Sequence, residues 1–330
     1  MLTESESRAL VYVRVLSMLS IVVCHICQTY RLIGWSDLFN SGVQVFFVMS
    51  GFLYGNKDIT LWKKWGIGRI KKIYLPYLVF LLGVIPFYIV FHKEAIIWKA
   101  VPFYFANLQG FRFLWGGAFA RIEGLRHVWF LTAIMCGYLI TPLLQKIKGR
   151  SQLLFPVLLL SILIIYITIS GRFVFILSWG YLYAAGYLFA NLNERHRFVY
   201  SLIFLTCLFA LSLYMNWNDL MHIYSIKYRF LHDIIGICVV VWGIRLMSKV
   251  KYNVPAFVSF FDKYSFPIYL THFILICGPF SMAYLTPYRS INILLMLAST
   301  AVATWVLVRL IQWINKLPFI NELDKKYLEK

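Results

Sequence analysis

Long apolar stretches constrain this chain more than any other feature of its sequence. A run of about 20 apolar residues crosses the roughly 30 Å hydrocarbon core of a bilayer as an α-helix. Such runs recur along the 330 residues, of which 61% are hydrophobic and only 14% are charged. An ordinary soluble domain is about 45–50% apolar and about 25% charged. The sequence therefore predicts an integral membrane protein that uses the lipid bilayer as its solvent.

The apolar runs predict an all-α fold, a polytopic helical bundle with about ten transmembrane helices. Residues 1–315 form the transmembrane domain in this prediction, and residues 316–330 form a cytoplasmic amphipathic tail. No basic segment or small-residue cleavage site precedes the first run, so we expect it to be retained as a helix. The expected spans lie near residues 9–30, 39–55, 73–91, 127–145, 152–171, 173–190, 198–216, 229–248, 264–285 and 290–314.

The net charge of +19 follows from basic residues at the ends of the apolar runs. The positive-inside rule places most Lys and Arg residues on the cytoplasmic side, which predicts an N-in and C-in topology in the cell membrane. Topology thus explains the charge, and no nucleic acid partner is expected. The densest cytoplasmic cluster follows the second span and is basic enough to bind phosphates: Lys57, Lys63, Lys64, Arg69, Lys71 and Lys72.

The six cysteines all lie in apolar segments, where a cysteine behaves as a small hydrophobic residue. Cys24 and Cys27 flank His25 in a spacing that resembles a redox or metal motif. No second pair of ligands accompanies them, and we therefore predict packing and no metal site.

Two ionisable residues, Arg14 and His25, lie inside the first apolar run. Burying such groups in a membrane costs free energy, so their presence indicates a function. A separation of 11 residues returns to nearly the same helix face about 16 Å along the axis, with Met18 and Ile21 between them. An N-in topology places Arg14 near the cytoplasmic end and His25 in the outer half. Snorkelling of Arg14 and helix packing by His25 are the alternatives.

A ligand with an anionic head and a reactive group on a long arm would match this stripe, and acyl-CoA has that shape. The phosphates would lie among Arg14 and the basic cluster, and the thioester near His25. His127 and the His232–Asp233 pair fall near outer helix ends, where an acceptor would arrive. Contact with water at the interface is the alternative for both.

The long outer segment 92–126 is predicted to lie at the interface or to stack on sugar rings. Its aromatic residues are Trp98, Phe103, Tyr104, Phe105, Phe111, Phe113 and Trp115.

Five motifs in order resemble the acyltransferase-3 family of bacterial membrane O-acyltransferases. The first is Arg14 with His25, and the others are Gln44-Val-Phe-Phe-Val-Met-Ser-Gly-Phe52, Arg69-Ile-Lys-Lys-Ile-Tyr-Leu-Pro76, His127-Val-Trp-Phe-Leu131 with Tyr138 and Pro142, and Tyr264-Ser-Phe-Pro-Ile-Tyr-Leu-Thr-His272. Two positions depart from the pattern of many relatives. Lys72 stands in place of an arginine, which removes bidentate phosphate geometry. The stretch after Trp129 lacks an acidic pair, which puts a carboxylate-dependent mechanism in doubt.

This resemblance implies transfer of an acyl group, usually acetyl, from cytoplasmic acetyl-CoA or another acyl-CoA to a hydroxyl of a surface glycan or glycolipid precursor, in the bacterial cytoplasmic membrane. It implies His25 as the catalytic residue, with Arg14, Arg69, Lys72 and Ser50 binding the acyl-CoA. The acceptor side is predicted to involve His127, Trp129, Asp233 and His272. A neutral imidazole with a pKa near 7 suits a general base that activates a hydroxyl.

Two other classes of protein also bury Arg and His in a membrane. A transporter or flippase would carry them along a substrate path and is expected to show broken helices or inverted repeats. A membrane scaffold would use them only for packing. The sequence leaves open the acyl group, the acceptor, the choice between direct transfer and an acyl-enzyme, and the oligomeric state.

Overall fold

The computed structural model describes residues 2–113, 122–168, 173–214, 226–250, 253–318 and 320. Throughout these residues the regular structure is helical, apart from one isolated bridge between Ile96 and Ile122. This confirms the predicted all-α class. The end of the expected span 152–171, the aromatic residue Trp115 and most of the predicted amphipathic tail lie outside the described residues.

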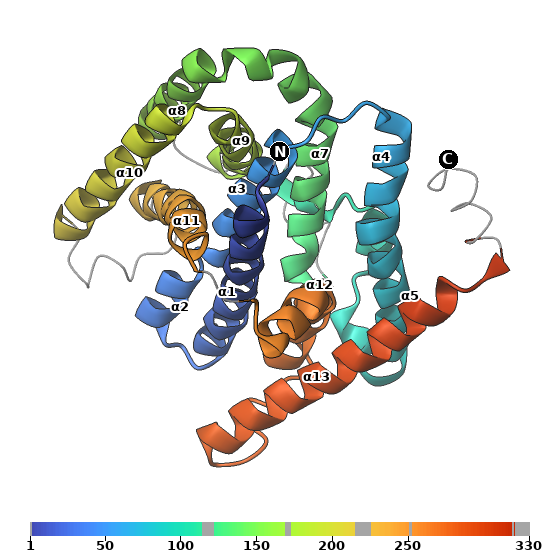
Figure 1. The fold of residues 1–330 in the computed structure, drawn as a ribbon. Helices are drawn as coiled ribbons and strands as arrows, with labels where there is room; N and C mark the ends of the chain where they lie inside the picture. Colours follow the sequence, from blue (N-terminus) through green and yellow to red (C-terminus); the bar gives the residue numbers. More distant parts are fainter. Residues whose placement is uncertain are drawn as a thin grey trace. The chain divides into compact units, whose positions relative to one another are not determined.

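The helices follow one another along the chain as Figure 1 shows. Their bounds are α1 Glu4–Thr29, α2 Ile33–Phe39, α3 Gly42–Gly55, α4 Trp62–Arg69, α5 Leu75–Phe91, α6 Val101–Phe105, α7 Trp129–Ile147, α8 Ser151–Thr168, α9 Phe173–Ala190, α10 Glu194–Tyr214, α11 Ile226–Met247, α12 Ala256–Ile276 and α13 Arg289–Ile314. Each predicted span coincides with an α-helix. The expected ninth span at 264–285 lies too late in the chain, because α12 begins at Ala256 and includes the charged residues Asp262 and Lys263, which a criterion of apolar runs excludes.

Five helical segments among the described residues are long and apolar enough to cross a membrane: Glu4–Thr29, Gly34–Gly55, Trp62–Phe91, Arg126–Ile162 and Arg289–Ile314. The chain is therefore a multi-pass membrane protein. The count of ten spans and the N-in, C-in orientation stay predictions.

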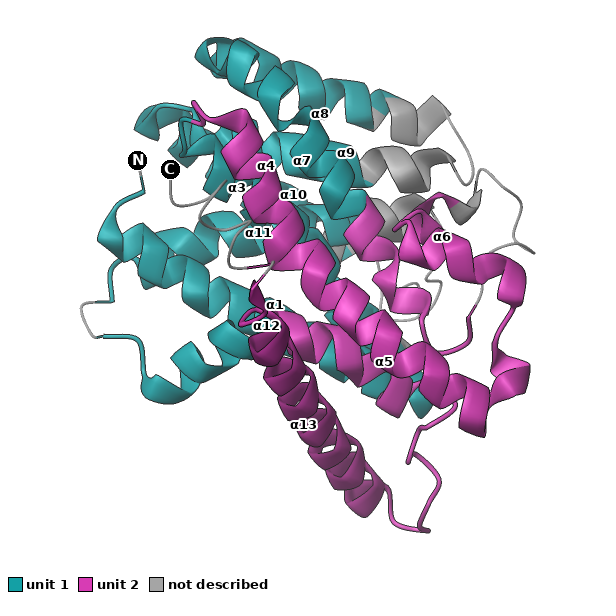
Figure 2. Ribbon diagram, turned by 90° about the vertical axis from the view of Figure 1, so that its right-hand side faces the viewer, with its two compact units in different colours: residues 1–58, 133–265 teal, residues 59–132, 266–330 magenta. Residues whose placement is uncertain are grey.

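The chain divides into two compact units, coloured separately in Figure 2. Unit 1 comprises Met1–Asp58 and Ala133–Ser265, and unit 2 comprises Ile59–Thr132 and Phe266–Lys330. The two units are described in turn.

Unit 1 is built around a very close contact between α3 and α9. A Cβ atom on Gly51 would overlap the backbone carbonyl of Tyr183, and a Cβ atom on Gly186 would overlap that of Val48. Small residues let helix backbones approach in this way inside membranes. One turn away, the rings of Phe47 and Trp179 lie with centroids 5.0 Å apart. Residue numbers rise together along the two helices, so α3 and α9 run in the same direction, as an alternating topology requires for spans two and six.

Ion pairs in unit 1 join helix ends that alternation places on one side of the membrane. Arg197 at the start of α10 lies 3.6 Å from Glu6 in the first turn of α1. Lys148, just after α7, pairs with Asp58, which follows α3. Both contacts agree with the predicted order of crossings.

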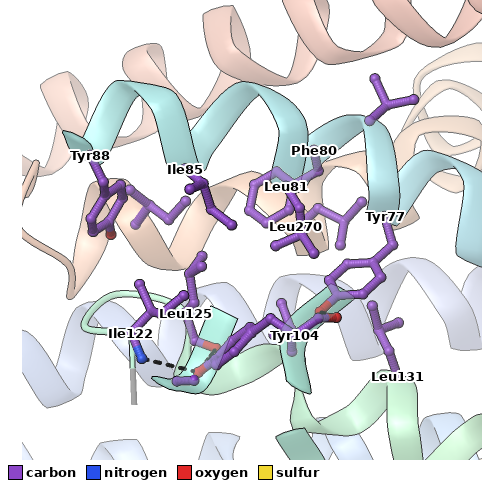
Figure 3. Close-up of a cluster of buried hydrophobic side chains, with 14 of the residues drawn as sticks. Tyr77, Phe80, Leu81, Ile85, Tyr88, Tyr104, Ile122, Leu125, Leu131 and Leu270 are labelled. Carbon is purple, nitrogen blue, oxygen red and sulfur yellow. Dashed lines mark hydrogen bonds between the residues drawn. The ribbon is translucent and has the colours of Figure 1, made fainter. Parts of the chain in front are cut away.

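Unit 2 has its own core along α5, drawn in Figure 3. Tyr77, Leu81, Ile85 and Tyr88 recur on one face of α5 at helical spacing and are buried. They pack with Tyr104 and the other labelled residues of the figure: Phe80, Ile122, Leu125, Leu131 and Leu270.

Tyrosine hydroxyls satisfy the irregular backbone that follows α5. The Tyr77 hydroxyl donates to the carbonyl of Tyr104 at 2.8 Å, and the Tyr88 hydroxyl donates to that of Glu123 at 2.8 Å. Non-helical backbone is tolerated in a membrane protein where it is buried and its polar groups are paired. Tyr104 is accordingly a core residue with 2% exposure, which contradicts the predicted interfacial or sugar-stacking role for this member of the aromatic segment. Trp98 is half exposed.

Candidate active site

Helix α1 fixes the positions of both predicted polar residues of the first span. It begins with a capping box in which the Thr3 hydroxyl accepts from the Glu6 amide at 3.1 Å, while the Glu6 carboxylate accepts from the Thr3 amide. Met18 and Ile21 are buried, and Arg14 and His25 lie half-buried on the same stripe. The predicted stripe thus faces neighbouring helices.

The His25 ring is held by Gln28, one helical turn further along α1. The Nδ1 atom of His25 lies 2.9 Å from Oε1 of Gln28, and the Gln28 amide nitrogen donates to the sulfur of Cys24. A carbonyl oxygen can only accept a hydrogen bond, so Nδ1 carries the proton and Nε2 of the neutral ring is basic. An imidazole oriented by a second group in this way has the geometry expected of a general base.

Gln28 was not identified from the sequence, although its position three residues after His25 places it on the same helix face. Cys24 and Cys27 are buried, as expected for packing residues.

Arg14 forms an ion pair that was also not predicted. Its Nη1 atom donates to Oδ1 of Asp262 on α12 at 2.7 Å, and the two side chains are 29% and 19% exposed. A paired, partly buried Arg has a defined orientation, and the guanidinium still has further N–H groups for an anionic ligand. Asp262 on α12 therefore fixes the orientation of the Arg14 side chain.

We expect Arg14 and Asp262 to be energetically coupled. Because removing one partner leaves a partly buried charge, Arg14→Gln and Asp262→Asn should each destabilise unit 1. The double variant should lose less than the sum of the two, by about 1 kcal/mol. Thermal unfolding of the purified variants in detergent measures this coupling, and additive losses would show that the pair contributes nothing to stability.

The other predicted acyl-CoA contacts lie on α3 and around the end of α4. Ser50 on α3 is half-buried beside Gly51. Arg69 ends α4 and is half-buried, whereas Lys72 is exposed. Residues Ile70–Tyr74 form a π-helical turn, because Pro76 has no N–H to continue the α-helical ladder. Such π-turns occur often at functional sites, and this one determines where Lys71 and Lys72 project.

His127 and His272 form a buried pair in unit 2. They are 5% and 0% exposed, and their ring centroids lie 5.3 Å apart in an edge-on arrangement. Nε2 of His127 donates to the carbonyl of Leu270 at 3.1 Å, and Nδ1 of His272 donates to the carbonyl of Tyr269 at 2.8 Å. The Tyr269 hydroxyl in turn donates to the carbonyl of His127. Backbone carbonyls therefore fix the tautomers of both rings.

Trp129 begins α7 and is half-buried, two residues from His127. Asp233 on α11 is 1% exposed and accepts a hydrogen bond from the Tyr181 hydroxyl at 2.7 Å. His232 is also buried, at 3%. The burial of His127, His232 and Asp233 contradicts the contact with water that the alternative interpretation expected of them.

The predicted site residues are thus divided between the units. Unit 1 holds the oriented imidazole of His25 and the guanidinium of Arg14, together with Ser50 and Asp233. Unit 2 holds the basic and paired-histidine groups, which are Arg69, Lys72, His127, Trp129 and His272.

The described helices are those of a polytopic membrane protein, and α1 carries on one face an imidazole held by Gln28 and a guanidinium paired with Asp262. The family model of the acyltransferase-3 family, described as an acyltransferase domain, matches residues 8–310 of the chain. The chain therefore belongs to this family. No curated protein and no solved structure matches the chain.

Proposed function

We infer from its family that this multi-pass membrane protein is an acyltransferase. We propose that it transfers an acetyl group from cytoplasmic acetyl-CoA to a hydroxyl of a surface glycan or glycolipid precursor in the bacterial cytoplasmic membrane, with His25 as general base. The observation that carries this proposal is the Nδ1–H bond of His25 to Gln28, which keeps Nε2 basic on the same helix face as Arg14.

In the proposed reaction, Nε2 of His25 removes the proton of the acceptor hydroxyl as its oxygen attacks the thioester carbonyl. The tetrahedral intermediate collapses, the carbon–sulfur bond breaks, and the imidazolium returns its proton to the leaving thiolate. The Gln28 carbonyl oxygen stabilises the transient imidazolium by accepting from Nδ1–H. Ser50, which lies in the same unit as His25, is the candidate donor to the oxyanion.

Within unit 1, Arg14 is the proposed contact for the phosphates of acetyl-CoA. Its guanidinium is held by Asp262 and retains further N–H groups for an anionic ligand. Arg14→Gln should therefore raise the KM for acetyl-CoA.

The acceptor is tested by mass spectrometry of surface glycans from cells with and without the protein. The proposal expects an acetyl group that is present only with the protein and is lost in the His25→Ala variant. Glycans that are identical in the two strains would contradict the glycan acceptor.

Gln28→Leu should lower kcat by up to about tenfold, because it removes one hydrogen bond to the ring and frees the tautomer. The KM for acetyl-CoA should stay unchanged, since Gln28 is remote from the proposed phosphate contacts. Gln28→Glu, which retains an acceptor for Nδ1–H, should recover activity. Steady-state kinetics of the purified variants measure both quantities, and equal loss in the Leu and Glu variants would contradict an orienting role.

A further inference from the structure

Helix α2 carries a buried carboxylate that the proposed reaction does not use. Asp37 is 1% exposed, and within the described part of the chain no group donates a hydrogen bond to either of its carboxylate oxygens. The other buried or partly buried acids of unit 1 differ in this respect. Asp233 accepts from Tyr181, and Asp262 pairs with Arg14.

An unsatisfied buried carboxylate is costly to a folded protein. Burying a polar group without a partner costs free energy, and an ionised group costs far more. A leucine at position 37 would fill the same space without that cost. An orphaned polar group in a native fold calls for an explanation, and a bound ligand that supplies the missing donors is one that can be tested.

The surroundings of Asp37 are polar on the side of α11. Nε2 of His232 donates to the backbone carbonyl of Asp37 at 2.7 Å, and His232 is itself 3% exposed. The next residue on α11 is Asp233, which holds the Tyr181 hydroxyl of α9. Helices α2, α11 and α9 thus bring two carboxylates, an imidazole and a phenol into one region of unit 1.

A carboxylate is an acceptor with two oxygens, so the ligand that complements it must donate hydrogen bonds. Among the residues that the structure describes, no group of three or more His, Cys, Asp and Glu side chains is placed to hold a metal ion. One carboxylate is also too little for a cation that takes six or more oxygen ligands. Hydroxyl groups satisfy the requirement without adding a charge.

We propose that Asp37, oriented through its backbone by His232, binds hydroxyl groups of the acyl acceptor. This inference rests on the proposed function and names the residue that recognises the acceptor in it. Asp233 contributes less to recognition than Asp37, because one of its oxygens is already taken by Tyr181.

Access to Asp37 requires a displacement of α2, since the side chain is buried. The helix has only seven residues, and its N-cap residue Leu32 makes no side-chain capping bond. It follows Arg31, whose φ of 56° is in the left-handed region that non-glycine residues seldom adopt. At its other end the Ser20 hydroxyl donates to the Phe39 carbonyl at 2.9 Å. The Ser20 and His232 side chains join α2 to α1 and α11, so a movement that admits a ligand must keep or exchange these two bonds.

The test compares Asp37→Leu and Asp37→Asn with the wild type and with Asp58→Asn, an exposed carboxylate in the same unit. Thermal unfolding of the purified full-length protein is measured with and without a set of methyl glycosides of glucose, galactose, mannose and N-acetylglucosamine. We expect a glycoside to raise the melting temperature of the wild type and of Asp58→Asn. Asp37→Leu should melt higher than the wild type without glycoside and gain nothing from it.

A kinetic arm uses the same glycosides as acetyl acceptors. Asp37→Asn should raise the KM for the glycoside about tenfold or more, and the KM for acetyl-CoA should not change. If the glycosides stabilise the wild type through Asp37 but accept no acetyl group, the proposed function fails and the binding site stands. The inference is overturned if no glycoside stabilises the wild type, or if Asp37→Leu lowers the melting temperature and keeps the response to glycoside.

Discussion

Replacing His25 by alanine is expected to reduce the rate of acetyl transfer by a factor of about 100 to 10,000, the usual contribution of a positioned general base. The variant lacks the group that removes the hydroxyl proton, and the remaining catalysis comes from binding alone. Because His25 lies three turns of α1 from Arg14, the affinity for acetyl-CoA should change little. Initial rates of acetyl transfer and an equilibrium measurement of acetyl-CoA binding, both with purified protein, separate the two effects.

A matched control is His196→Ala, which removes a histidine in the first turn of α10 whose ring forms a hydrogen bond with Asn193. This variant should keep full activity. His25→Gln retains polarity at the position without a base and should be as inactive as His25→Ala. Activity in His25→Ala within a few-fold of the wild type would contradict a base at this position.

The largest loss of stability is expected when either glycine of the α3–α9 contact gains a side chain. Gly51→Ala and Gly186→Ala each place a Cβ atom onto a backbone carbonyl of the opposite helix, where no side chain can rotate away. Overpacking of this kind costs about 3 kcal/mol. Thermal or denaturant unfolding in detergent should show this loss for each variant.

Gly180 supplies the control, because it lies on α9 together with Gly186. A Cβ atom there meets nothing within 4 Å, so Gly180→Ala should be neutral or stabilise the helix by about 0.5–1 kcal/mol. If Gly51→Ala and Gly180→Ala unfold alike, the close approach of α3 and α9 is incorrect.

The sequence predicted the features that depend on local pattern. Apolar runs located the helices, and the helical period placed Arg14 and His25 on one stripe of α1. Gly51 of the second motif lies at the very close contact between α3 and α9, where a small residue is required. These predictions succeed because the bilayer fixes the length of a helix and the 3.6-residue period fixes which residues share a face.

The features that depend on tertiary contacts were missed. The expected ninth span begins after Asp262 and gives this residue no role, whereas the carboxylate lies within α12 and pairs with Arg14 across a helix contact. Asp37 lies between two predicted spans, where a charged residue is ordinarily solvated, and its burial arises from α11 packing against α2. Tyr104 belonged to a segment that resembled an interfacial loop, but tyrosine hydroxyls and apolar contacts fold this segment against α5.

The central claim is that His25 carries the chemistry of acetyl transfer. The direct test reconstitutes the wild type and the His25→Ala variant in liposomes with radiolabelled acetyl-CoA and glycan acceptor, and measures the label in the glycan. The account predicts label with the wild type and almost none with the variant, although both bind acetyl-CoA. Equal labelling by the two proteins, or no labelling of glycan by the wild type, would contradict it.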